Sequence, residues 1–95
     1  MLVLPERLTH ADAPACARML AQALRSGAPA QVVADAGALQ EFDSSALAVL
    51  LDCRREALSM GKTFAVARMP ARLGELASVY GVSELLAPAQ AQSQA

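Results

Sequence analysis

The feature that most constrains the fold of this chain is an apolar run followed, after a short loop, by the pattern of a long helix. Residues 32–34 (Val-Val-Ala) form the run, and apolar residues recur at helical spacing over residues 44–60, up to Gly61. The run predicts a strand, and glycine is the typical residue just beyond the end of a helix. A strand that leads directly into a helix predicts an α/β domain.

The rest of the chain repeats this alternation. Short apolar runs at residues 2–4 and 63–67 predict two further strands, and amphipathic patterns after each of them predict two further helices. A length of 95 residues leaves room for one domain. We therefore expect a single small α/β domain over residues 1–87, with a mostly parallel or mixed sheet packed against helices. Residues 88–95 show no apolar period, which predicts a disordered C-terminal tail.

Composition excludes several kinds of partner. The net charge is −1 and only 3% of the residues are aromatic, so no basic and aromatic surface for nucleic acid is expected. No apolar run approaches the ~20 residues of a membrane-spanning helix, which predicts no direct insertion into a membrane. Cys16 and Cys53 fall on apolar helix faces and are expected to be buried, reduced thiols.

The sequence lacks the residue sets of an enzyme or a metal site. His10 is the only histidine, and no Cys, Asp or Glu cluster accompanies it at metal-ligand spacing. There is no Gly-rich phosphate loop, and the hydroxyls of Ser44 and Ser45 have no candidate base, because His10 belongs to a different loop. We therefore expect no catalytic activity, no cofactor and no metal.

Asp43, Ser44 and Ser45 stand where the long helix is expected to begin. Short side-chain oxygens at such positions accept hydrogen bonds from the free N–H groups of the first helical turn. The same place lies at the positive end of the helix dipole, which favours an added phosphate or an anionic group of a partner. The segment is therefore either an ordinary helix cap or a regulatory site as well.

The first two turns of the long helix are apolar on nearly all sides. Its polar residues Asp52, Arg55, Glu56 and Ser59 come only in the later half. A helix that is apolar all round is usually buried on both sides, and a chain of this length offers little material for a second layer. The pattern indicates either a partner-binding surface or burial under the flanking loops and the last helix.

Two segments of the chain resemble the signature of STAS domains. The first comprises residues 32–35, Leu39 and residues 42–47 (Phe-Asp-Ser-Ser-Ala-Leu), with Ala46 where the family commonly has Gly. The second comprises residues 70–82 and is similar to the family's last helix, with its proline, spaced leucines and terminal glycine. The resemblance implies the STAS fold and a regulatory, non-catalytic binding role. STAS domains usually open with two strands, and this chain is expected to start at the second. The shortened N-terminal strand would then leave one edge of the sheet open. An open edge favours a homodimer or the exchange of a strand or helix between two copies.

Two branches of the family are compatible with these residues. The segment Leu76-Ala77-Ser78-Val79-Tyr80 is similar to the pattern of the MlaB-type subunit of Mla phospholipid-transport systems. This resemblance implies binding to the cytoplasmic ATPase subunit of an ABC transporter that serves outer-membrane lipid asymmetry. It also implies a cytoplasmic location, peripheral at the inner membrane through that partner. The segment Asp43-Ser44-Ser45 is similar instead to the anti-sigma factor antagonists, which implies an anti-sigma factor kinase as partner and phosphorylation of Ser44.

Of the two branches, the Mla subunit is favoured because of the pattern at residues 76–80. The residues expected to take part in partner binding or regulation lie just before the long helix, along it, or at the end of the last helix: Asp43, Ser44, Ser45, Leu47, Arg54 and Tyr80.

Overall fold

The computed structural model describes residues 2–27 and 30–86 of the chain. They form helices and short strands in the order β1 (Leu2–Val3), β2 (Arg7–Leu8), α1 (Ala13–Arg25), β3 (Gln31–Asp35), β4 (Glu41–Phe42), α2 (Ser45–Ser59), β5 (Thr63–Ala67), α3 (Ala71–Val79) and the 3-10 turn η1 (Ser83–Leu86). The tail predicted at residues 88–95 lies outside the described residues.

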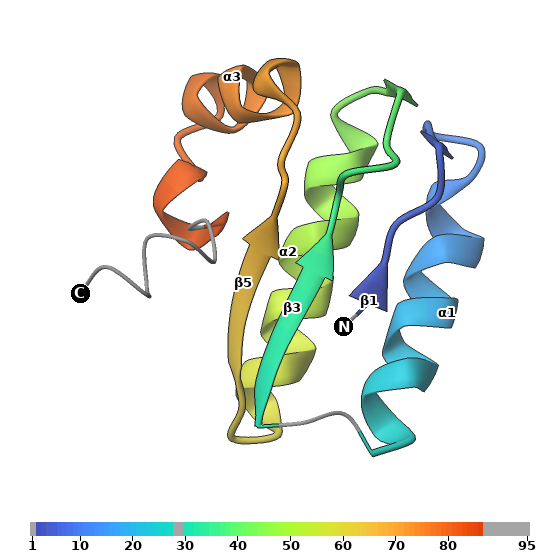
Figure 1. Ribbon diagram of the computed structural model, residues 1–95, viewed down its shortest axis with the longest axis vertical. Coiled ribbons are helices and arrows are strands. Elements are labelled where there is room, and N and C mark those ends of the chain that lie inside the picture. The colour runs from blue at the N-terminus through green and yellow to red at the C-terminus, as the bar shows by residue number, and fades with distance from the viewer. Residues whose placement is uncertain (1, 28–29, 87–95) are drawn as a thin grey trace.

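The main sheet is parallel, with the strand order β1-β3-β5 (Figure 1). Strands β3 and β5 pair along their whole length, with Val33 opposite Ala65, and β1 pairs with the end of β3, with Leu2 opposite Ala34. Parallel neighbours need a crossover connection, which α1 and α2 provide. The prediction of a small α/β domain with a mostly parallel sheet is confirmed.

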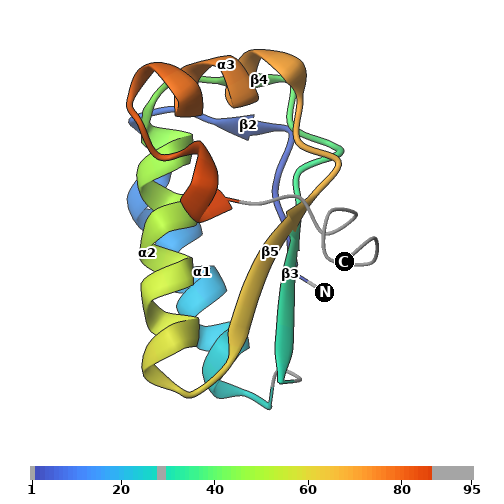
Figure 2. The same cartoon turned by 90° about the vertical axis from the view of Figure 1, so that its left-hand side faces the viewer.

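The structure contains a second parallel pair that the sequence pattern did not indicate. Strands β2 and β4 pair with Arg7 opposite Glu41 and Leu8 opposite Phe42. Each has two residues, which is too short for an alternating pattern to stand out. The pair lies next to α3, at the end of the molecule where β3 and β5 finish (Figure 2).

Helices α1 and α2 cover one face of the main sheet, and the opposite face carries no helix among the described residues (Figures 1 and 2). Successive side chains of a strand point to opposite faces. Val32, Ala34, Phe64 and Val66 occupy the helix-facing positions and are at most 8% exposed. On the open face Val3 remains 59% exposed. The core therefore lies in a single layer between sheet and helices.

The apolar start of α2 belongs to this core. Ala46, Leu47, Val49 and Leu50 are between 0 and 3% exposed, because α2 packs against α1, β5 and η1 at once. Burial is thus the alternative that the structure adopts for these four side chains, whereas Ala48 in the same turns is exposed and Leu51 is half-buried. As predicted, Gly61 follows the helix with a positive φ of 75°.

Candidate functional site

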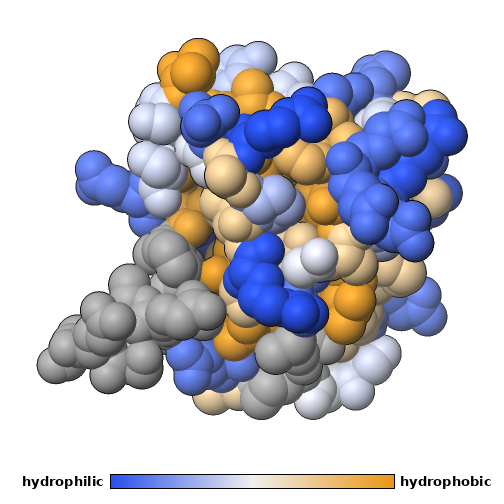
Figure 3. Space-filling model, turned by 45° about the horizontal axis from the view of Figure 1, so that its top comes forward, coloured by the Kyte–Doolittle hydropathy of each residue, from blue (hydrophilic) through white to orange (hydrophobic). Residues whose placement is uncertain are grey.

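The predicted site lies at the end of the molecule where strands β3 and β5 finish. The start of α2, the pair β2–β4 and helix α3 gather there (Figures 1 and 2). Ligand sites of α/β folds usually lie at the carboxyl ends of the parallel strands. Figure 3 views the molecule with this end turned forward. Apolar and weakly polar side chains gather in the middle of the view, a strongly hydrophilic group lies just below them, and further hydrophilic side chains lie toward the edges.

Asp43 fixes the segment that precedes α2. Its Oδ1 accepts a hydrogen bond from the N–H of Ser45 at 2.8 Å, and its Oδ2 accepts one from the N–H of His10 at 3.1 Å. The first bond satisfies a free donor at the start of the helix, and the second joins the loop before α2 to the loop before α1. These bonds, above all the one from Ser45, keep the pKa of the Asp43 carboxyl below its ordinary value.

Ser44 does not cap α2 through its side chain. It occupies the N-cap position, but its hydroxyl makes no capping hydrogen bond. Within the segment expected to cap the helix, the carboxylate of Asp43 therefore makes the contact with the first turn, and the Ser44 hydroxyl does not. Ser44 is exposed and Ser45 is half-buried, so within the described part of the chain the Ser44 hydroxyl is available to a partner.

Two of the predicted site residues lie elsewhere. Leu47 is 3% exposed and packs in the hydrophobic core, which corrects its expected place on a partner-binding surface. Arg54 is half-buried and lies nine residues after Ser45, about 13 Å further along the axis of α2. The structure therefore does not bring Arg54 together with Asp43 and Ser44.

Tyr80 follows the last residue of α3 and is 59% exposed, and its neighbour Val79 is 81% exposed. The same helix buries Leu73 and Ala77, which are 0 and 1% exposed. Large apolar side chains that remain exposed in one short segment indicate an interaction surface. The end of α3 is thus the exposed apolar part of the predicted site.

The sequence carried no signal for a further polar contact at this end, the pair of Asp35 and Arg68. Nε of Arg68 donates to Oδ1 of Asp35 at 3.0 Å, and Nη2 donates to Oδ2 at 2.6 Å. Oδ1 also accepts the N–H of Gly37 at 2.8 Å. These bonds, chiefly those from Arg68, keep the pKa of the Asp35 carboxyl below its ordinary value. The two side chains are 33 residues apart, so only the pairing of β3 with β5 brings them together.

A second arginine joins α3 to the segment before α2. The guanidinium carbon of Arg72 lies 5.3 Å from the centroid of the Phe42 ring, which is a cation–π contact. Phe42 directly precedes Asp43 in the chain. Arg72 therefore helps to set the position of α3 relative to the start of α2.

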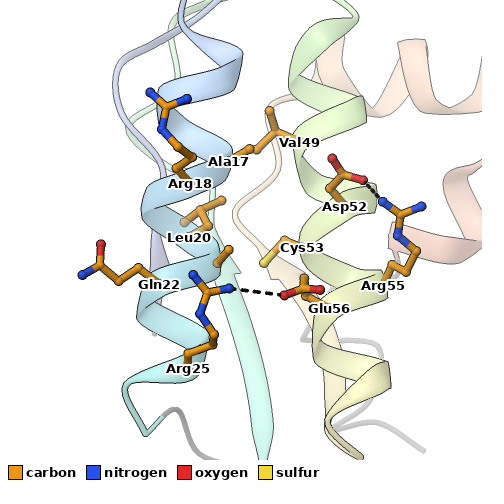
Figure 4. Close-up of a pocket in the computed structure, with 11 residues that line it drawn as sticks. Ala17, Arg18, Leu20, Gln22, Arg25, Val49, Asp52, Cys53, Arg55 and Glu56 are labelled. Carbon is orange, nitrogen blue, oxygen red and sulfur yellow. Dashed lines mark hydrogen bonds and ion pairs between the residues drawn. The ribbon is translucent and has the colours of Figure 1, made fainter.

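A groove of about 500 Å³ lies between α1 and α2, outside the predicted site. Figure 4 shows its apolar floor, which includes Leu20, Val49 and Cys53, and its charged rim, where Arg25 and Glu56 approach to 3.7 Å. The rim holds a second ion pair between Arg55 and Asp52, whereas Arg18 lies on the opposite wall and is not paired with either acidic group of the rim.

Both cysteines are buried and free, as predicted. Burial raises the pKa of the Cys53 thiol to about 11 and also raises the pKa of Cys16. Both groups therefore remain protonated thiols at neutral pH, and the thiol is the less reactive form. They contribute to packing between α1 and α2.

Within residues 2–27 and 30–86, no group of three His, Cys, Asp or Glu side chains is placed to hold a metal ion. None of the helices in the same residues is long and apolar enough to span a membrane.

Comparisons with known proteins support the STAS interpretation. A family model described as "Mlab, STAS domain" matches residues 1–87. Among solved structures, the chain is similar to a Thermotoga maritima protein described as a candidate anti-sigma factor antagonist, with a TM-score of 0.78 and 15% sequence identity over 97% of this chain and 84% of that chain. At this identity the likeness shows a shared fold alone. A search of curated proteins found no match. The match of the family model over most of the chain shows that this protein belongs to the STAS domain family, in the group described as Mlab.

Proposed function

We propose that this STAS domain is a non-catalytic subunit of an Mla-type phospholipid ABC transporter and binds its cytoplasmic ATPase. The family-model match over residues 1–87 is the observation that carries the proposal. In this role the protein acts in the cytoplasm, reaches the inner membrane only through its partner, and serves the lipid asymmetry of the outer membrane.

The surface that suits such a partner lies at the carboxyl end of the sheet. Ser44 presents its hydroxyl beside the positive end of α2, and Val79 and Tyr80 supply exposed apolar area on α3. An apolar centre with a few polar groups is the usual composition of a protein–protein interface. Tyrosine is also enriched among the residues that carry most of the binding energy. These features support binding to a protein surface.

A homodimer of the isolated domain remains a prediction. Strand β1 forms one edge of the main sheet, and Val3 on this strand is 59% exposed. The unpaired backbone groups of an edge strand favour pairing with another chain.

A negative charge at Ser44 tests the proposed function. Ser44→Glu should fold, because a carboxylate is favourable at a helix N-terminus. In a packed interface, however, the same charge is desolvated without a partner, so we expect the Kd for the purified ATPase to rise at least about tenfold. Calorimetric titration measures the Kd, and thermal unfolding checks that the variant is folded.

Two control variants separate charge from bulk and from position. Ser44→Gln has the size of glutamate without its charge and should retain most of the binding. Ser59→Glu adds the same charge at the exposed far end of α2 and should bind like the wild type. A transporter complex that lacks this chain and keeps full ATPase activity would show the proposal to be wrong. Tight binding by both the wild type and Ser44→Glu would place the interface elsewhere on the domain.

A second candidate function is that of an anti-sigma factor antagonist. Two observations favour it: the exposed Ser44 directly follows Asp43, and the fold is shared with the Thermotoga maritima protein described above. In this case the partner is an anti-sigma factor kinase, and it phosphorylates Ser44. Mass spectrometry after incubation with that kinase and ATP distinguishes the two functions, because an Mla subunit is not expected to become phosphorylated.

A further inference from the structure

We propose that Arg68 is a preorganised binding residue, whose outward N–H groups donate hydrogen bonds to main-chain carbonyl groups of the partner ATPase. The identity of the partner rests on the proposed function. The contact itself is inferred from the geometry of Arg68 and its neighbours.

Asp35 and Gly37 fix the guanidinium group of Arg68. Asp35 accepts two of its N–H groups, at 3.0 and 2.6 Å. Asp35 is itself only 7% exposed and also accepts the N–H of Gly37, so its carboxylate cannot turn away without losing a third hydrogen bond. Gly37 lies so close to the guanidinium that an added Cβ would come within 2.5 Å of Cζ. The position of the group is therefore determined by the loop that follows β3.

The backbone of Arg68 is also unusual. Its φ is 55°, and within the described residues no other non-glycine residue has a positive φ. A side chain with a Cβ adopts this left-handed region at a cost, and such conformations persist where surrounding contacts compensate for the strain. The bidentate pair with Asp35 provides this compensation, and the hydrogen bond from the Ala36 N–H to the Ala67 carbonyl, at 2.9 Å, joins the two strand ends beside it.

The pair is not a closed internal contact. The side chain of Arg68 is 66% exposed, whereas that of Asp35 is 10% exposed. A guanidinium carries five N–H donors, and Asp35 uses one on Nε and one on Nη2. The donors that remain are two on Nη1 and one on Nη2. An arginine already held in one conformation loses little side-chain entropy when a partner binds, and arginine is enriched at binding hot spots.

The charge balance indicates the chemistry of the partner group. The carboxylate of Asp35 already neutralises the guanidinium. A second carboxylate would bring an excess negative charge into the interface, where its desolvation is costly. Main-chain carbonyls are neutral acceptors, and they are left free at the carboxyl end of a helix. We therefore assign the contact to carbonyl groups, and we expect its contribution to depend little on salt.

The place of Arg68 agrees with the proposed interface. Arg68 directly follows β5, at the end of the sheet where α2 begins and α3 lies (Figure 2). A partner that covers the end of α3 and Ser44 therefore needs to extend only across this end of the sheet to reach it.

Gly37→Ala is the sharpest test, because it removes no donor, acceptor or charge. The φ of Gly37 is not in the left-handed region, and the three nearest atoms that a new Cβ would meet all belong to the Arg68 side chain. We expect the variant to fold with a displaced guanidinium, and its Kd for the ATPase to rise about tenfold, as in Arg68→Ala. In the double variant the two losses should not add, because both substitutions remove the same contact.

Arg55→Ala is the matched control. Arg55 is also an exposed arginine paired with an aspartate, but its partner Asp52 lies one turn away on the same helix. This variant should bind like the wild type. The carboxyl pKa of Asp35, followed by NMR, gives a readout that needs no partner: it should rise toward its ordinary value in both Gly37→Ala and Arg68→Ala.

The outcomes separate this proposal from the proposed function. A wild-type domain that does not bind the ATPase overturns both. Tight binding by the wild type, Gly37→Ala and Arg68→Ala alike overturns the role of Arg68 alone. A tenfold loss that disappears at high salt overturns the assignment to carbonyl groups, since that behaviour indicates a carboxylate.

Discussion

The start of α2 and the end of α3 are both rich in apolar residues, yet most of these residues are buried in α2 and exposed at the end of α3. At the start of α2, residues 46, 47, 49 and 50 are 0 to 3% exposed. At the end of α3, Val79 and Tyr80 are 81 and 59% exposed. Helix α2 packs against α1, β5 and η1, while α3 packs mainly against η1. Apolar character alone therefore does not distinguish core from interface, and the position of a helix relative to the sheet does.

The two segments also depend on different aspartates. The start of α2 is fixed by Asp43, which accepts the N–H of Ser45 and of His10. The turn before α3 is fixed by Asp35, which pairs with Arg68. Asp43 reaches the loop before α1 through His10, and Asp35 reaches the end of β5 through Arg68, so both aspartates join segments that are far apart in the sequence.

The largest effect on stability is expected from truncating a buried side chain. Leu50→Ala should lower the free energy of unfolding by about 2–5 kcal/mol, because Leu50 is fully buried and its truncation leaves a cavity. Val79→Ala, a truncation of the exposed segment, should stay within about 0.5 kcal/mol of the wild type. Urea unfolding of both variants measures the difference, and equal effects would contradict the contrast between the two helices.

A smaller effect on the thermal stability is expected when the pH is lowered. Hydrogen bonds lower the pKa of Asp35, chiefly through Arg68, and of Asp43, chiefly through Ser45, below the ordinary value of 3.8. A depressed pKa stabilises the folded state above the unfolded-state pKa, and this stabilisation is lost as pH falls through the folded-state pKa. The Tm should therefore be constant above about pH 5 and fall below about pH 4. Arg68→Ala should show a smaller fall over the same range, and an equal fall would argue against the role assigned to the Asp35 pair.

The smallest effect distinguishes Asp43 from Ser44 at the start of α2. Asp43→Ala should lower the Tm by a few degrees, because it removes the hydrogen bonds to Ser45 and His10. Ser44→Ala should leave the Tm unchanged, since the Ser44 hydroxyl makes no capping bond. Thermal unfolding of the two variants measures both values. A larger loss in Ser44→Ala would identify the serine as the cap.

Local patterns were sufficient for most of the fold but not for the site. The strand at residues 63–67 and the end of α2 before Gly61 follow from hydrophobic spacing and glycine conformation, which involve only nearby residues. The pair β2–β4 was not predictable, because two residues per strand carry no period. Of the predicted site residues, Asp43, Ser44 and Tyr80 lie at the carboxyl end of the sheet, and Leu47 proved to belong to the core.

The sequence by itself determined the order of the three strands of the main sheet and of the three helices, the mostly parallel α/β class and the STAS resemblance, because each depends on spacing along the chain. Only the tertiary structure decided which apolar helix is enclosed, that Asp43 rather than Ser44 caps α2, and that Asp35 meets Arg68 across 33 residues. Burial and hydrogen-bond partners depend on which segments meet in space, and that is settled only when the helices pack against the sheet.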